Sequence, residues 1–210
     1  MKKVIITAAA LLLGAATLFA GDRGFYITGG YAMGLDKYTN LTKSKSKEIS
    51  NGFYAGIGYN IKELFGEGGS IDAGIQYAGF WGKQLETVLG IPYKGQQKDS
   101  YIQIPVRARY TWENDNVNFF LYAGPKFMFG LKSQFIGELV TVNWYAKQLE
   151  NAYKRFNLML GLGGGIEIGG HFRIDLGYDW GVINRYKGDL KDSGCKLYES
   201  MLTAGVAVCF

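Results

Sequence analysis

The sequence predicts an all-β fold, one eight-stranded antiparallel up-and-down transmembrane β-barrel. Three observations predict it. Apolar residues alternate with polar or small ones in eight successive segments, the connections between these segments alternate between long and short, and the polar face of the segments carries charge. Alternation with period two is typical of strands whose two faces meet different environments. Membrane barrels repeat such segments between turns.

Each segment has one apolar face. In the first segment Phe25, Ile27 and Tyr31 share this face, and Tyr26 and Thr28 lie on the other. A tilted strand of about ten residues is long enough to cross a bilayer. The eight segments are 25–33, 53–61, 71–81, 102–112, 118–129, 156–168, 172–182 and 198–210.

The connections differ in length in a regular order. Bacterial outer-membrane barrels have short periplasmic turns and long outer loops, whereas a soluble sandwich has no reason to keep long and short loops in strict alternation. We therefore expect a protein of the cell outer membrane with its N- and C-termini in the periplasm. The long connections are 35–50, 83–99, 132–154 and 185–197, and the short ones are 62–68, 113–117 and 169–171.

Two prolines interrupt the strand pattern. Pro105 and Pro125 lie inside predicted strands, and proline cannot donate a hydrogen bond to a sheet. We expect a β-bulge near each of them. A wrong strand assignment at these points is the alternative.

The N-terminus has the three parts of a secretory signal. Lys2 and Lys3 precede an apolar run from Val4 to Ala20, which is shorter than the ~20 apolar residues of a membrane-spanning helix. We expect residues 1–20 to be a signal peptide and residues 21–210 to form the outer-membrane barrel domain. A retained N-terminal anchor is the alternative.

The composition also favours strands. Gly makes up 31 of 210 residues, beside 15 Tyr, 13 Phe and only 3 Pro; glycine with aromatic residues is typical of sheets rather than helices. Removal of Lys2 and Lys3 with the signal lowers the formal net charge from +5 to +3, which is too mild for a nucleic-acid partner. Cys195 and Cys209 fall at opposite ends of the predicted barrel, so we expect them to stay unpaired.

Charged residues lie on the face opposite to the apolar one, so the barrel interior has to hold them. Side chains just fill the interior of an eight-stranded barrel, and a buried charge is costly unless it is paired. We predict a structural network of ion pairs that plugs the interior; a narrow path for ions or small solutes is the alternative. The network residues are Arg107, Arg109, Lys126, Glu167, Arg173, Asp175 and Asp179.

Residues that would support catalysis are scarce. His171 is the only histidine and lies in a predicted turn, whereas a barrel lipid A deacylase needs Ser and His in contact with lipid. One histidine and two distant cysteines do not make a metal site. The glycine-rich run 161–165 continues through a strand, while a nucleotide-binding loop follows a strand and opens a helix. We predict no enzyme activity, no cofactor and no metal.

Two long loops are candidates for contacts with partners. Lys43, Lys45 and Lys47 offer charge to the phosphates of outer-membrane lipopolysaccharide, with a merely solvated loop as the alternative. The third long loop carries more apolar residues than a loop without a partner should expose. Docking of a partner is one interpretation of this loop, and a hairpin that extends beyond the membrane is the other. The candidate docking residues are Phe135, Val140, Trp144 and Tyr145.

From Tyr101 onward the sequence resembles a known family. Residues 101–110 (YIQIPVRARY) are similar to the aromatic-x-Glu-Ile-Pro strand of the PorT-type outer-membrane β-barrels of Bacteroidetes, which belong to the porin family. Residues 120–125 (FLYAGP) are similar to its Ala-Gly-Pro strand, and 156–184 to its next hairpin. The resemblance covers 99–210 well and 24–98 only in general pattern.

The resemblance implies an outer-membrane barrel, and through the family's named member it implies secretion-system proteins of type IX secretion as partners. Many members are barrels without an assigned function. The sequence ends in Phe210, as barrels that are read by the barrel-assembly machinery usually do. We therefore expect this machinery to be a partner during assembly of the barrel. Gln103 stands where the family often has Glu, and Gly177 where Arg precedes the aromatic residue; both positions face the predicted interior.

Three functions are thus carried forward. The first is a structural or assembly barrel, and the most specific version of this hypothesis is an accessory of type IX protein secretion. The second is a small porin-like channel for ions or small solutes, which bilayer conductance separates from the first. The third is a lipid-modifying barrel enzyme, and the missing outward histidine counts against it.

Overall fold

A computed structural model describes residues 24–40, 43–88, 91–137, 141–146 and 153–210, with only the backbone for 83–88 and 91–94. The predicted signal peptide, residues 1–20, lies outside the described residues. Among the described residues no helix is long and apolar enough to cross a membrane.

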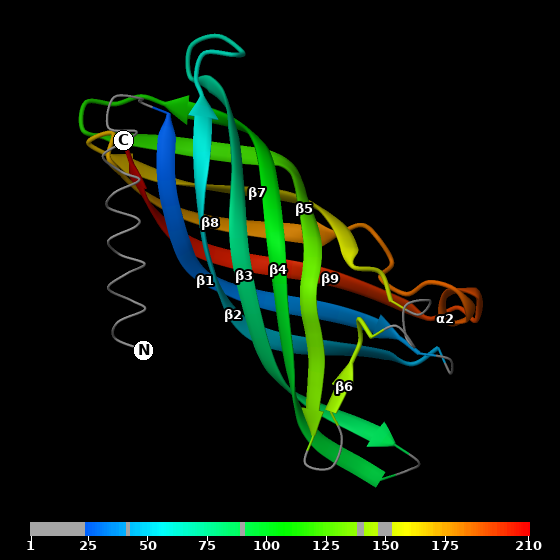
Figure 1. Cartoon of the computed structure of the whole chain (residues 1–210). Coiled ribbons are helices and arrows are strands. Elements are labelled where there is room, and N and C mark those ends of the chain that lie inside the picture. Colours follow the sequence, from blue (N-terminus) through cyan, green and yellow to red (C-terminus); the bar gives the residue numbers. More distant parts are fainter. Residues whose placement is uncertain (1–23, 41–42, 89–90, 138–140, 147–152) are drawn as a thin grey trace, which may run out of the picture.

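Eight long strands form a closed antiparallel ring (Figure 1). Each strand pairs with its neighbours, and pairing of the last strand with the first closes the ring. The eight-stranded up-and-down barrel predicted from the sequence is therefore confirmed. A ninth, short strand, β6 (Thr141–Asn143), pairs with β5 outside the ring. The ring strands are β1 (Phe25–Thr39), β2 (Lys45–Ile61), β3 (Gly69–Val88), β4 (Ile91–Trp112), β5 (Val117–Gly137), β7 (Phe156–Ile168), β8 (Phe172–Gly181) and β9 (Lys196–Cys209).

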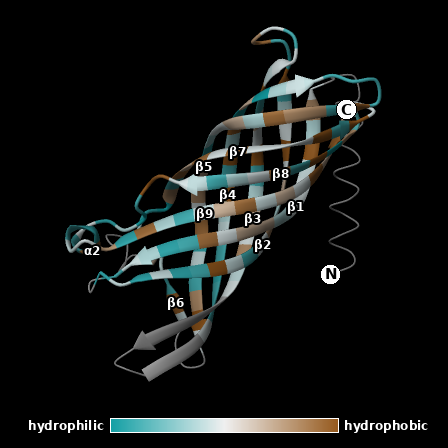
Figure 2. Ribbon diagram, turned by 180° about the vertical axis from the view of Figure 1, so that it is seen from behind, coloured by the Kyte–Doolittle hydropathy of each residue, from teal (hydrophilic) through white to brown (hydrophobic). Residues whose placement is uncertain are grey.

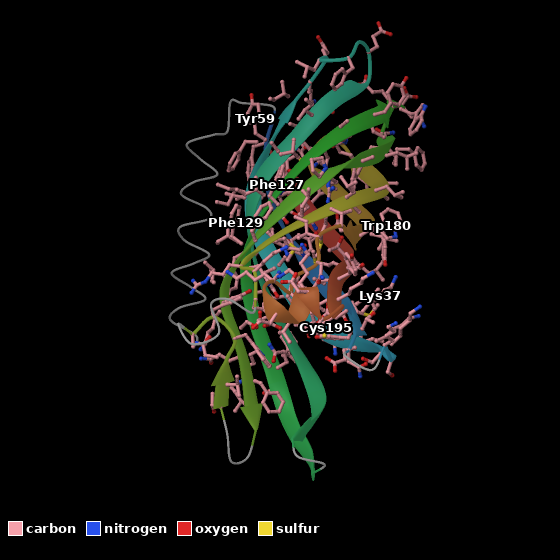
Figure 3. The ribbon with its side chains drawn as sticks, turned by 90° about the vertical axis from the view of Figure 1, so that its right-hand side faces the viewer. Lys37, Tyr59, Phe127, Phe129, Trp180 and Cys195 are labelled. Carbon is pink, nitrogen blue, oxygen red and sulfur yellow. The ribbon has the colours of Figure 1, made fainter. Side chains whose placement is uncertain are left out.

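The two faces of the barrel wall are inverted relative to a soluble protein. Leu176 on the outside is 63% exposed, whereas Arg107 and Gln103 on the inside are buried. Figure 2 shows this alternation as hydrophobic and hydrophilic bands along the strands. Figure 3 shows Tyr59, Phe129 and Trp180 among the side chains that line the outside. Outward aromatic residues at both ends of an apolar band are typical of membrane interfaces.

The barrel has two different ends, which are named here by their connections. The short turns lie at the turn end, where the C-terminus lies beside Phe25. The hairpin of β1 and β2 and the short helix α2 (Asp189–Asp192) lie at the loop end. Cys195 precedes β9 and Cys209 ends it, so they lie at opposite ends, and both are free as predicted.

The strands run further at the loop end than the sequence predicted. Residues 35–39 and 45–50 of the first predicted loop belong to β1 and β2, and all described residues of the second predicted loop, 83–99, belong to β3 and β4. Polar residues such as Lys37, Lys45 and Lys47 take outward positions in the first of these extensions, so the apolar–polar alternation by which a strand is recognised fades there. Backbone pairing between the two arms of each hairpin is enough to continue the sheet.

The prolines interrupt the ladder without bulging it. Pairing of β4 with β3 stops at Ile104 and Pro105, and pairing of β4 with β5 stops opposite Gly124 and Pro125, but the register is the same on both sides of each gap. The expected bulges at the prolines are therefore wrong. Because proline lacks only one backbone donor, losing a few ladder bonds accommodates it. The register shift lies instead between Ser100 and Tyr101.

Candidate functional site

The interior of the barrel is filled in three layers from the turn end to the loop end. Two groups of ion pairs lie toward the turn end, an apolar layer crosses the middle, and a further buried ion pair lies at the loop end. Strands on opposite sides of the ring contribute to each layer because their inward side chains meet in a narrow lumen.

The group nearest the turn end joins two arginines with two carboxylates. Glu167 accepts hydrogen bonds from Arg109 at 2.8 Å and from Arg173 at 3.3 Å. Asp72 lies 3.6 Å from Arg109 and 3.5 Å from Arg173. The guanidinium of Arg109 also lies 4.1 Å from the centre of the Phe120 ring. Equal numbers of opposite charges let the group persist in a dry lumen.

The second group is built on Asp179 of β8. Its carboxylate accepts a hydrogen bond from Lys126 at 2.6 Å and another from Arg107, and all three side chains are buried. Asp175 lies close by and accepts a hydrogen bond from the Tyr122 hydroxyl at 3.4 Å. One carboxylate thus holds two cations that would otherwise be buried without a direct ion-pair partner.

The middle layer is an apolar cluster with charged neighbours, since Met159 lies opposite Lys126 and Met201 lies opposite Asp179 in the sheet. Three methionines, Met128, Met159 and Met201, are each at most 2% exposed and close the centre together with aromatic and small side chains. Gln103 donates a long hydrogen bond of 3.8 Å to the sulfur of Met201. Because its eight members are each at most 7% exposed, the layer leaves little open space at the centre of the lumen. The other members of the layer are Ala32, Tyr54, Ala78, Phe80 and Tyr101.

Arg185 closes the loop end. This residue follows β8 and is 0% exposed. It donates hydrogen bonds of 2.8 Å to Glu199 on β9 and 2.8 Å to the hydroxyl of Tyr145, which lies between β6 and β7. Its guanidinium also lies 5.2 Å from the ring centre of Tyr153. Through its bonds to Tyr145 and Glu199, Arg185 therefore holds the β6–β7 and β8–β9 connections against strand β9.

Comparison with known proteins agrees with this architecture. A family model described as "Outer membrane protein beta-barrel domain" matches residues 25–186. The chain belongs to this outer-membrane barrel family. No curated protein is similar enough in sequence to count as a match.

Three solved structures are similar to this chain. Neisserial surface protein A is 16% identical over 89% of this chain and 97% of its own, with a TM-score of 0.50. Ail of Yersinia pestis, solved with the heparin analogue sucrose octasulfate, is 17% identical over 89% and 99%, with a TM-score of 0.45. OprG of Pseudomonas aeruginosa is 12% identical over 89% and 96%, with a TM-score of 0.46. At 16% identity, the likeness to Neisserial surface protein A shows a shared fold alone.

The barrel brings together most of the interior residues that the sequence singled out. Six of the seven form ion pairs, and Asp175 is held through Tyr122. Sequence reasoning missed Asp72, Glu199 and Arg185. The first two alternate with outward residues, so their strand positions could have identified them, whereas Arg185 lies in a connection that has no periodic signal.

The proposed docking residues of the third long loop are mostly turned inward. Phe135 and Tyr145 are buried, and Trp144 donates a hydrogen bond of 3.2 Å to Gln97. Val140 lies outside the described residues. Phe135 and Tyr145 offer no surface to a partner, so docking at this loop stays a prediction that other residues of the loop would have to carry.

His171 lies exposed in the turn between β7 and β8, where a ring nitrogen is 3.4 Å from the carbonyl oxygen of Cys209. No group of acidic, histidine or cysteine side chains in the described part of the chain is arranged to hold a metal ion.

Two carboxyl groups at the loop end lie beyond the apolar band of the strands. Burial raises the pKa of Asp99 to about 6, although hydrogen bonds from Ser133 and Gln97 oppose the increase. Burial also raises the pKa of Asp36 well above its usual range, and the charges of Glu199 and Asp99 add to this increase. Both groups therefore bind a proton more readily in the folded barrel than in the unfolded chain.

We expect the barrel to become more stable as the pH falls from about 7 toward 4. The folded pKa of Asp99 exceeds its unfolded value of about 3.9, so its stabilising contribution is complete below the unfolded pKa and is lost as the pH rises through about 6. The shift corresponds to at most about 3 kcal/mol. Urea unfolding in vesicles at several pH values should show that Asp99→Asn stabilises the barrel near pH 7.5 and flattens this dependence. An unchanged pH dependence in Asp99→Asn, matching that of the exposed-site control Asp115→Asn, would refute the assignment.

Proposed function

We propose that this outer-membrane barrel is closed to solutes and has a structural or assembly role. The proposal is based on the filled interior of the barrel. Along the lumen, the two groups of ion pairs are followed by the middle layer and then by the buried ion pair of Arg185 and Glu199 at the loop end. A channel needs a path of polar contacts that an ion can enter and leave. The middle layer, made of eight apolar side chains that are each at most 7% exposed, fills the lumen at its level and leaves no such path open.

The refolded barrel should show no stable conductance steps in planar bilayers. Its folded state is first checked by the change in gel mobility on heating, and a wide porin in the same bilayers serves as the positive control. Reproducible single-channel steps from folded protein would instead establish the small porin-like channel and reject the closed barrel.

For the orientation, we infer that the turn end and both chain termini face the periplasm. The short connections at this end support the inference, since bacterial barrels keep short turns on the periplasmic side. Phe210 packs against Phe25 with 6.0 Å between ring centres, so the last strand contacts the first at this end of the barrel. The loop end then faces the outside.

The most specific version of the assembly role is that the barrel acts as an accessory of type IX secretion. The resemblance of residues 99–210 to PorT-type barrels supports it. A tagged pull-down from the native outer membrane in mild detergent tests it: stoichiometric secretion-machinery proteins would support the accessory role, and recovery of the barrel alone would favour a free-standing structural barrel. Catalysis has no part in the proposal, because His171 is the only histidine of the sequence and lies in an exposed turn.

A further inference from the structure

Lysines cross three neighbouring strands on the outside of the barrel at the loop end. Lys37 on β1 lies directly opposite Lys47 on β2. Thr39 on β1 lies between Lys45 on β2 and Lys196 on β9. We call Lys37, Lys45, Lys47 and Lys196 the lysine ladder. All four are exposed, and Figure 3 shows Lys37 on the outside of the wall.

The opposite charges on the same strands face the other way. Asp36 lies opposite Glu48 on β2 and Glu199 on β9, and each of these carboxylates is less exposed than the ladder lysines. Because successive residues of a strand point to opposite faces, the wall separates an acidic inner face from a basic outer face. Among the described residues no ion pair involves a lysine of the ladder.

The arrangement is unfavourable unless an anion joins it. Like charges directly opposite each other in an antiparallel pair destabilise the sheet. Lys37 and Lys47 are such a pair, and Lys45 and Lys196 add positive charge one step further along. A group with several negative oxygens would turn this repulsion into attraction, since lysine binds phosphate as a point charge.

The position of the ladder indicates which anion it meets. The next pair toward the membrane on the same face is Leu35 opposite Ile49, and Ile49 is 59% exposed. This apolar pair is two residues away, or about 7 Å along a strand. The lysines therefore lie just beyond the apolar surface, at the level where lipid headgroups begin, and basic residues next to a membrane attract anionic headgroups.

We propose that the lysine ladder binds the phosphate groups of a phosphorylated glycolipid in the outer leaflet, of the lipopolysaccharide type. The proposal rests on the orientation proposed above, in which the loop end faces the outside. The lysines approach the phosphates from the side of the barrel, while the apolar surface around Ile49 contacts the acyl chains below. The sugar part of the lipid faces the solvent beside the β1–β2 hairpin.

The proposal is tested with folded, full-length mature barrel in zwitterionic detergent. The probe is fluorescently labelled lipid A, used in its phosphorylated and dephosphorylated forms. The triple variant Lys37→Gln/Lys47→Gln/Lys196→Gln should bind the phosphorylated probe at least about tenfold more weakly than the unchanged protein. Binding of the unchanged protein should weaken with added salt, as expected for exposed charges.

A matched control removes the same amount of charge elsewhere. Lys62, Lys132 and Lys191 are exposed on three separate parts of the barrel and form no cluster, and Lys62→Gln/Lys132→Gln/Lys191→Gln should leave binding nearly unchanged. Equal losses in the two triple variants would reduce the effect to net charge and overturn the proposal. Equal affinity of the unchanged protein for both forms of the probe would overturn it as well, because apolar contact alone would then explain binding.

A competition experiment distinguishes lipid from polysaccharide. If a soluble sulfated oligosaccharide displaces the probe and binds as tightly as phosphorylated lipid A, the ladder is a site for anionic polysaccharide and the lipid proposal is wrong. Heat-dependent gel mobility confirms that each variant is folded. If lipid A does not bind, the proposal of a closed barrel still stands, because conductance does not depend on the lysine ladder. If the barrel conducts ions, the proposal of lipid binding still stands.

Discussion

Replacing Asp179 with Asn should lower the free energy of unfolding by about 3–5 kcal/mol. Asp179 is the carboxylate that pairs with both Arg107 and Lys126, and all three side chains are buried. Breaking a buried pair from one side leaves the other charge without compensation, and here two cations are left. Urea unfolding in vesicles, followed by tryptophan fluorescence, measures the loss.

The matched control for this variant is Asp115→Asn, because Asp115 is exposed in a turn and its replacement should change stability by less than about 0.5 kcal/mol. A second variant separates the ion pair from general damage. Adding Lys126→Met to Asp179→Asn removes one of the two unpaired cations and should recover part of the loss. Similar stability of Asp179→Asn and the Asp115 control would show that the pair does not brace the interior.

Replacing Arg185 with Met should release the connections that close the loop end. Glu199 would lose its cation and Tyr145 the donor to its hydroxyl, while methionine keeps much of the apolar stem. Leaving one buried charge unpaired costs about 3–5 kcal/mol. We also expect trypsin to cleave folded barrel after Lys154 or Arg155, which follow the loop that holds Tyr145.

Unfolding in urea and mass spectrometry of the trypsin fragments give the two readouts. Lys191→Met is the control, since Lys191 is exposed on α2, and it should leave both readouts unchanged. If Arg185→Met loses stability but resists trypsin as well as the unchanged protein does, Arg185 supports the wall without fastening the loop.

The sequence was informative wherever a residue's surroundings depend on its immediate neighbours. The face on which Arg107 or Glu167 lies follows from alternation along one strand, so the interior network could be predicted without knowing its partners. The individual pairs could not be predicted, because Asp179 on β8 meets cations from β4 and β5, and the ring alone decides which inward residues share a level.

The loop end could be predicted least. Strand signals fade where polar residues interrupt the apolar–polar alternation, so the sequence predicts loops where β1 to β4 continue as paired strands. The aromatic residues of the third long loop suggested an exposed surface, yet Tyr145 is buried on Arg185. Inward burial of a loop depends on a cation placed 40 residues later in the chain, and no local pattern contains that information.

The ion pairs of the interior also constrain the order of assembly. Asp179 has both of its cations on strands that precede β7, and Arg173 on β8 reaches Asp72 on β3 across the lumen. A hairpin can hold an ion pair of its own, as β7 and β8 do with Glu167 and Arg173, but it leaves other inward charges such as Asp179 without a partner. A half-built barrel would therefore bring uncompensated charge into the bilayer. Stepwise insertion of hairpins is therefore opposed, and closure of the ring with neutralisation of its lumen becomes one cooperative event.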